Sequence, residues 1–197
     1  MPLAFRPCRG AVILIQRLLR GESMRFALVV VLAMLTLMAR AAPVTLEWDH
    51  LIPEDWNPEK EVNELAERIN RTEDEDPEAM SIMDDIQALW NSAPLQQSLD
   101  DKDIRLTGFG VPLEGDADYV REFLLVPYFG ACIHAPPPPR NQIILVRASG
   151  KGVPLDAIMG ALQVTGTLKV TPEETEYGQA GYSMKASDVK IISEPLY

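Results

Sequence analysis

The chain has 197 residues, 47% of them hydrophobic, with 18 Lys and Arg against 29 Asp and Glu. The hydrophobic fraction is too high for wholesale disorder and is typical of a folded domain. A formal charge of −11 argues against a nucleic-acid binder, because phosphate contacts need a concentrated Lys and Arg surface. Two cysteines exclude a disulfide scaffold.

Residues 1–41 are predicted to be a secretory signal peptide. Met24 and Arg25 precede an apolar run of 13 residues, Phe26 to Met38, and the small residues Ala39 and Ala41 occupy the −3 and −1 positions. The run is too short for a membrane span, which needs about 20 apolar residues. We expect translation to start at Met24, cleavage to follow position 41, and the mature protein to be periplasmic with no membrane anchor.

Removal of this basic segment changes the charge and the cysteine count. The mature chain keeps 12 basic and 28 acidic residues, a net charge of −16 over 156 residues. Cys8 leaves with the segment, so Cys132 becomes the single cysteine in an oxidising compartment. An exposed lone thiol would be oxidised there, and Cys132 is therefore predicted to be buried or ligated.

Residues 42–102 are predicted to form an extended arm and an acidic helical pair. The arm, residues 43–56, is rich in Pro and carries Trp48 and Trp56 as aromatic anchors. Helix starts are indicated where Asn57 precedes Pro58 and where Asp76 precedes Pro77, because an N-cap followed by proline favours a first helical turn. Apolar residues recur at helical spacing after each start. A short third turn is expected from Pro94 to Leu99.

Residues 103–197 carry the pattern of a small β domain. Glycines inside two of the segments, at 108, 110 and 166, favour bends or bulges that curl a sheet closed. The five segments are Ile104 to Leu113, Glu122 to Phe129, Gln142 to Ala148, Leu162 to Val170 and Tyr182 to Ile192. A short helix is expected in VPLDAIMGA, between the third and fourth. This order predicts a mainly β fold: a five-stranded OB-like β-barrel preceded by the acidic helical pair.

The acidic residues of the helical pair have two interpretations. Between Glu54 and Asp85 there are 13 acidic and three basic residues. This density of negative charge would attract a basic partner or a loosely bound cation. The other interpretation is that the charges only keep the helices solvated. No spacing here matches a calcium loop.

The stretch FLLVPYFGACIHAPPPPR holds the candidate site residues. Cys132 and His134 are two residues apart, so in extended backbone both side chains would share one face. Four prolines, Pro136 to Pro139, stiffen the chain beside them. Tyr128 and Phe129, with Arg140, are candidate pocket residues or plain core.

Three interpretations of Cys132 and His134 stay open. As ligands, a thiolate and an imidazole suit Zn²⁺ or copper, with further ligands from the arm. As catalytic groups, His134 would activate a Cys132 nucleophile, although no orienting third group is evident. As structure, both would be core residues. The candidate arm ligands are His50, Asp49, Glu47, Glu54 and Asp55.

The strings LEWDHLIPEDW, RLTGFGVPLE and FLLVPYFGACIHAPPPPRNQI resemble a bacterial exported family known only as a domain of unknown function. The resemblance extends from about Leu46 to the C-terminus. It implies a small periplasmic protein, in some bacteria encoded beside ABC-type transporter genes or under zinc-responsive control. It carries no catalytic residues, and this chain lacks the lipid-acceptor cysteine of the anchored members.

The function predicted on this basis is a non-enzymatic accessory of an ABC-type transport system in zinc homeostasis. Transporter components in the membrane are its expected partners, and zinc contact through Cys132 and His134, with Asp49 or His50, is its expected metal chemistry. One alternative is an interaction module that binds no ligand and docks through its PPPP segment or its acidic helices. The weaker alternative is a thiol-dependent enzyme.

Overall fold

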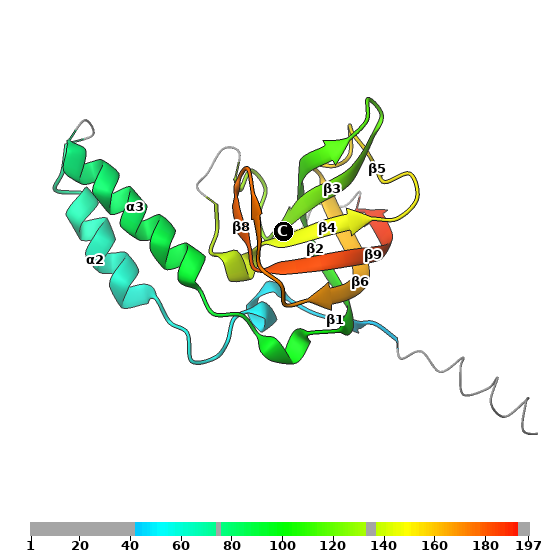
Figure 1. Ribbon diagram of the computed structural model, residues 1–197, viewed down its shortest axis with the longest axis horizontal. Coiled ribbons are helices and arrows are strands. Elements are labelled where there is room, and N and C mark those ends of the chain that lie inside the picture. Colours follow the sequence, from blue (N-terminus) through cyan, green and yellow to red (C-terminus); the bar gives the residue numbers. More distant parts are fainter. Residues whose placement is uncertain (1–41, 74–75, 133–136, 193–197) are drawn as a thin grey trace, which may run out of the picture. The chain divides into compact units, whose positions relative to one another are not determined.

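The computed structural model describes residues 42–73, 76–132 and 137–192 (Figure 1). The predicted signal peptide, His134 and the first of the four prolines lie outside these residues. Within the described ranges, no helix is both long enough and apolar enough to cross a membrane.

Five long strands form a closed barrel, as the sequence predicts. The strands are β2 (Lys102–Gly115), β3 (Tyr119–Val126), β4 (Ile144–Ala148), β6 (Ala161–Lys169) and β9 (Tyr182–Ile191). Antiparallel pairs join β2 to β3, β3 to β4, β9 to β6 and β6 back to β2, and a parallel pair joins β4 to β9 (Figure 1). This circular order, with its one parallel pair, is that of an OB-type barrel.

Strict alternation of side chains builds the barrel interior. In β6, Leu162, Val164, Gly166 and Leu168 are buried, while the alternate residues Gln163, Thr165 and Thr167 are half-buried. The β6–β9 register shifts between Thr165 and Gly166, so an irregularity is present beside this glycine as expected, with the extra residue, Ser187, on β9. A Cβ at position 166 would lie 2.5 Å from the Lys185 carbonyl oxygen, so glycine permits the close approach of the two strands.

The connection from β4 to β6 differs from the sequence expectation. In place of the short helix predicted there, the chain forms β5 (Val153–Pro154), which pairs with β3, and then a series of turns. Val153 and Pro154 are extended because they pair with β3, and the Ala157 and Gly160 amides donate to the Pro154 and Ala157 carbonyl oxygens, three residues back, in separate turns. Ile158 in the turns is fully buried and closes part of the core.

The N-terminal arm is held against the barrel by strand pairing and by Trp48. β1 (Val44–Thr45) pairs in parallel with β2, and η1 (Trp48–Leu51) follows as a single 3-10 turn. Trp48 packs on the core and donates a 2.8 Å hydrogen bond from Nε1 to the Thr107 carbonyl oxygen. Leu51 is fully buried. Trp48 is therefore an aromatic anchor, as predicted, and Trp56 is half-buried.

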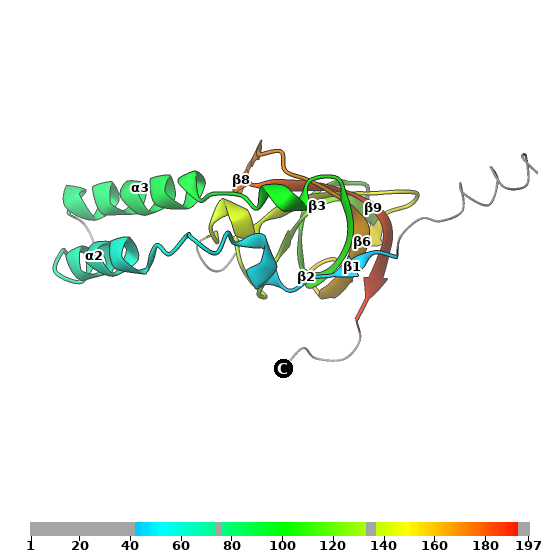
Figure 2. The same ribbon diagram turned by 90° about the horizontal axis from the view of Figure 1, so that it is seen from below.

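The acidic segment forms the two predicted helices, α2 (Glu59–Ile69) and α3 (Pro77–Ser92), which lie side by side in both views (Figure 1, Figure 2). Asp76 caps α3 as expected, whereas α2 begins one residue later than expected, at Glu59, with Pro58 in the cap position. The Asn57 side chain accepts from the Glu59 amide, and the Asp76 side chain accepts from the Glu78 amide. The expected third turn is η2 (Gln97–Leu99).

Two further elements complete the described chain. β7 (Glu173–Thr175) and β8 (Gly178–Ala180) form a hairpin between β6 and β9, which the sequence pattern did not indicate. η3 (Arg140–Gln142) is a 3-10 turn directly before β4.

Candidate functional site

Cys132 lies in a tight turn after β3 and not in extended backbone. Its φ angle is 65°, in the left-handed region that non-glycine residues rarely adopt, and Gly130 beside it has a φ of 81°. The side chain packs against a secondary apolar cluster that includes Ala131 and Ile143. The expectation of extended backbone through Cys132 is therefore wrong, because the turn breaks the side-chain alternation on which a shared face with His134 was argued.

The thiol of Cys132 is held in its neutral form. Cys132 is half-buried, and burial raises the pKa of its thiol to about 11. A pKa this high leaves almost no thiolate at pH 7. A nucleophilic cysteine needs the thiolate, which positive neighbours or a helix N-terminus stabilise. Cys132 therefore has the chemistry of a structural cysteine.

We expect iodoacetamide to alkylate Cys132 of the folded protein at least about tenfold more slowly than that of the urea-unfolded protein at pH 7.5. The raised pKa leaves fewer thiolates, and the greater nucleophilicity of a more basic thiolate offsets part of this loss. The folded rate should keep rising with pH toward 11, whereas the unfolded rate levels off earlier. Mass spectrometry of the Cys132 peptide gives both rates. Equal rates at pH 7.5 would instead indicate an activated thiol.

Two aromatic side chains before Cys132 face solvent. Phe129 is 62% exposed and Tyr128 is 44% exposed. The Phe129 ring meets Phe109 of β2 edge to face, with centroids 6.0 Å apart and planes at 74°, so its position is fixed by packing. Partial burial raises the pKa of Tyr128, which stays a neutral phenol. The two rings form an exposed apolar surface on the β3–β4 connection.

The candidate metal ligands of the arm lie in or near η1. His50 and Asp49 are exposed, and His50 Nδ1 accepts a 3.0 Å hydrogen bond from the Glu47 amide as part of the cap of this turn. Among the residues that the structure describes, no three His, Cys, Asp or Glu side chains gather in a group that could hold a metal. His134 lies outside those residues, so the pairing of Cys132 with His134 stays a prediction.

The residues after the proline run clamp the N-terminal extension onto the barrel, a role that the sequence analysis missed. Arg140 Nε donates to the Ala93 carbonyl oxygen at 2.7 Å, and Asn141 Nδ2 donates to the Pro94 carbonyl oxygen at 3.1 Å. Gln142 Nε2 donates to the Trp48 carbonyl oxygen at 3.0 Å. Arg140 is therefore a structural residue; its guanidinium also donates to Gln179. The sequence signal that could have revealed this role is the run of three hydrogen-bond donors, one guanidinium and two amides, directly before a buried strand.

A polar groove crosses β3 and β4 beside the β7–β8 hairpin. Its volume is about 540 Å³, and its walls include Glu114, Arg121 and Arg147. Arg147 donates to Glu122 at 2.7 Å and to Glu173 at 2.6 Å, which ties the hairpin to the barrel. The hydrogen bonds from Arg147 lower the pKa of Glu173, so this carboxylate stays ionised. Both carboxylates already accept hydrogen bonds from the Arg147 guanidinium, so these three side chains stabilise the attachment of the hairpin to the barrel.

The fold and the site define a small OB-type barrel protein with a helical N-terminal extension and a neutral, half-buried cysteine. The family model described as "Protein of unknown function (DUF3299)" matches residues 48–191, and the chain belongs to this family. The resemblance drawn from the sequence is confirmed as far as membership of a family of unknown function.

A solved relative supports the same assignment. The crystal structure of a DUF3299 family protein from Pseudomonas aeruginosa PAO1 is 37% identical to this chain and superposes with a TM-score of 0.60. The match covers 79% of this chain and 99% of the other. Comparison with curated proteins found no significant match.

Proposed function

We propose that the mature chain is a non-enzymatic accessory protein of the periplasm that works with an ABC-type transport system in zinc homeostasis. The family resemblance described in the sequence analysis supports the periplasmic location and the association with an ABC-type transport system and zinc. The half-buried Cys132 argues against a thiol enzyme, and the exposed Tyr128 and Phe129 side chains support contact with a partner.

The half-buried position of Cys132, packed against the secondary apolar cluster, is the observation that carries this proposal. Cys132 is the nucleophile that a thiol enzyme would use, and a pKa of about 11 removes the thiolate at physiological pH. Partial burial raises this pKa, and a half-buried neutral thiol is less prone to oxidation in an oxidising compartment than an exposed one. Partial burial therefore accounts for how a lone cysteine could stay reduced in an oxidising compartment, and no catalytic role is needed to explain it.

Phe129 is the best-placed residue for contact with a transport component. A large aromatic side chain that is exposed yet held in place by packing loses little conformational entropy on binding. Aromatic residues are also enriched at the centres of protein interfaces.

The test is site-specific photo-crosslinking in cells. With p-benzoylphenylalanine at position 129, we expect irradiation to join the protein to a component of an ABC-type transporter, identified by mass spectrometry. Leu155 is the matched control, because it is 48% exposed in the β5–β6 connection. Identical products from positions 129 and 155, or no product from 129, would contradict the proposal.

Zinc contact through Cys132 and His134 remains part of the proposal as a separate question. Zinc would have to displace the thiol proton, so its binding should strengthen as the pH rises. Metal analysis of the wild type beside Cys132→Ser and His134→Ala decides it: zinc that both substitutions leave unchanged would remove the ligand role.

A further inference from the structure

The helical hairpin of α2 and α3 leaves apolar surface uncovered. None of the residues of α2 is buried, and in α3 only Ile82 is. Met80 is 73% exposed and Met83 is 46% exposed, and their spacing of three residues places them on one face of α3. Exposed side chains of this size on neighbouring turns mark a contact surface more often than isolated ones do.

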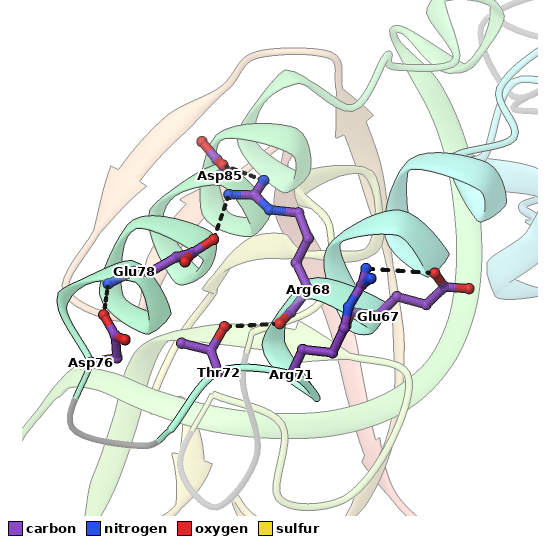
Figure 3. A network of polar contacts seen from close by, with 7 residues as sticks. All are labelled: Glu67, Arg68, Arg71, Thr72, Asp76, Glu78 and Asp85. Carbon is purple, nitrogen blue, oxygen red and sulfur yellow. Dashed lines mark hydrogen bonds and ion pairs between the residues drawn. The ribbon is translucent and has the colours of Figure 1, made fainter.

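These methionines line a groove between the two helices. The groove has a volume of about 370 Å³, and its apolar walls come from the end of α2 and the first turns of α3. The residues that line it are Ile69, Thr72, Ala79, Met80, Met83 and Asp84. Thr72 donates its hydroxyl to the Arg68 carbonyl oxygen, so its polar atom is already satisfied within α2 (Figure 3). Methionine side chains are flexible and polarizable, and they adapt to varied apolar partners.

The charges around the groove are acidic, and the basic side chains of the helices are already paired. Arg68 reaches from α2 to Asp85 at 3.3 Å and to Glu78 at 4.0 Å, and Arg71 pairs with Glu67 at 3.8 Å (Figure 3). Lys60 pairs with Glu64 at 3.8 Å.

Acidic side chains at the groove remain available to a partner. Asp84 lines the groove and forms no ion pair with any residue that the structure describes, and Glu73, next in the chain to the lining residue Thr72, is exposed. The field at the groove is therefore negative.

We infer that this groove binds a basic amphipathic helix of a partner protein. The Met80 and Met83 side chains would contact its apolar face, and Asp84 with its acidic neighbours would face its Lys or Arg residues. This is the helix-in-groove mode of recognition. α3 has 16 residues, about 24 Å, which sets the length of helix that it could contact along its axis. The inference rests on the proposed function, since it names the chemistry of a segment that such an accessory protein would bind.

Charge also separates this occupant from two others. A second copy of the chain would bring 13 acidic and three basic residues between positions 54 and 85 against an identical segment, and the two would repel. An anionic lipid surface would be repelled for the same reason.

The test uses the purified mature protein and a fluorescein-labelled 14-residue peptide of Leu and Lys, with the leucines on one helical face. We expect saturable binding by fluorescence anisotropy that weakens as salt is added. Met80→Gln combined with Met83→Gln should weaken binding at least about tenfold, since two apolar contacts are lost. Asp84→Asn should weaken it by about threefold, the size expected of one exposed ion pair.

Matched controls separate a groove from general attraction between opposite charges. Met159→Gln changes a methionine that is 36% exposed on the barrel and should leave the affinity unchanged. A peptide with the same residues in a non-amphipathic order should bind at least about tenfold more weakly, as should one with Glu in place of Lys. Circular dichroism should show the same helix content and melting temperature in every variant, because the substituted side chains are exposed.

Three results would overturn the inference: no binding of the Leu and Lys peptide, equal binding by the Met80 and Met83 variant, or sedimentation showing a dimer that the Met80 and Met83 substitutions dissociate. These results leave the crosslink from position 129 unaffected, because that site is on the barrel. If the crosslink from position 129 were missing but the peptide still bound, the proposed transport partner would be rejected and the inference about the groove would stand.

Discussion

Tyr182→Phe is expected to destabilise the protein by about 2–4 kcal/mol. The Tyr182 side chain is fully buried, and its hydroxyl donates to the Leu51 carbonyl oxygen and accepts from the Gln96 amide, both at 2.7 Å. Burial raises the pKa of Tyr182, which keeps the hydroxyl protonated and able to donate. Phenylalanine would leave both backbone groups without a partner, and each such loss costs about 1–3 kcal/mol.

Urea denaturation followed by circular dichroism measures this change. Tyr177→Phe is the matched control, because Tyr177 is half-buried beside the secondary apolar cluster and its hydroxyl forms no hydrogen bond with the described residues. We expect Tyr177→Phe to change the unfolding free energy by less than about 0.5 kcal/mol. Equal effects of the two substitutions would show that the Tyr182 hydroxyl does not hold the arm.

Gly108→Ala is expected to destabilise the protein by about 2–3 kcal/mol and to shift the tryptophan emission. A Cβ at position 108 would lie 2.6 Å from the Val126 carbonyl oxygen and 2.8 Å from Trp48 Cζ2. Either the β2–β3 pairing or the Trp48 ring must move, and overpacking of this kind costs about 1–3 kcal/mol. The emission should shift because Trp48 would leave its packed position.

Gly160→Ala provides the comparison for this substitution. Gly160 is exposed in the turns before β6, and the nearest atom to an added Cβ there is the Ala157 carbonyl oxygen at 3.2 Å. We expect a change of less than about 1 kcal/mol and an unaltered emission spectrum. If Gly108→Ala behaved in the same way, Trp48 would not be packed against β2 as described.

The elements that local sequence controls were predictable. β6 alternates apolar and polar residues along its length, and α3 begins where Asp76 and Pro77 provide a cap and a first turn. The order of the five predicted strands then indicated an OB-like barrel. The expected helix after β4 was wrong because Val153 and Pro154 pair with β3, a long-range contact that the local sequence does not reveal.

The parts of the site that long-range contacts control could not be predicted. Arg140 and Ala93 are 47 residues apart, and nothing near either residue indicates that they meet. The left-handed backbone of Cys132 follows from how the turn packs on the barrel, so a period counted along the sequence could not reveal it. The brace formed by Arg147 depends in the same way on a hairpin that carries little strand signal.

The hydrogen bonds of the N-terminal arm determine when folding can finish. Trp48 and Gln142 are 94 residues apart, and Leu51 and Tyr182 are 131 residues apart. A chain that ends before Tyr182 can form the β1–β2 pairing and the bond from Trp48 to Thr107, but not the bond from the Tyr182 hydroxyl to Leu51. Docking of the arm is therefore complete only when nearly the whole sequence is present.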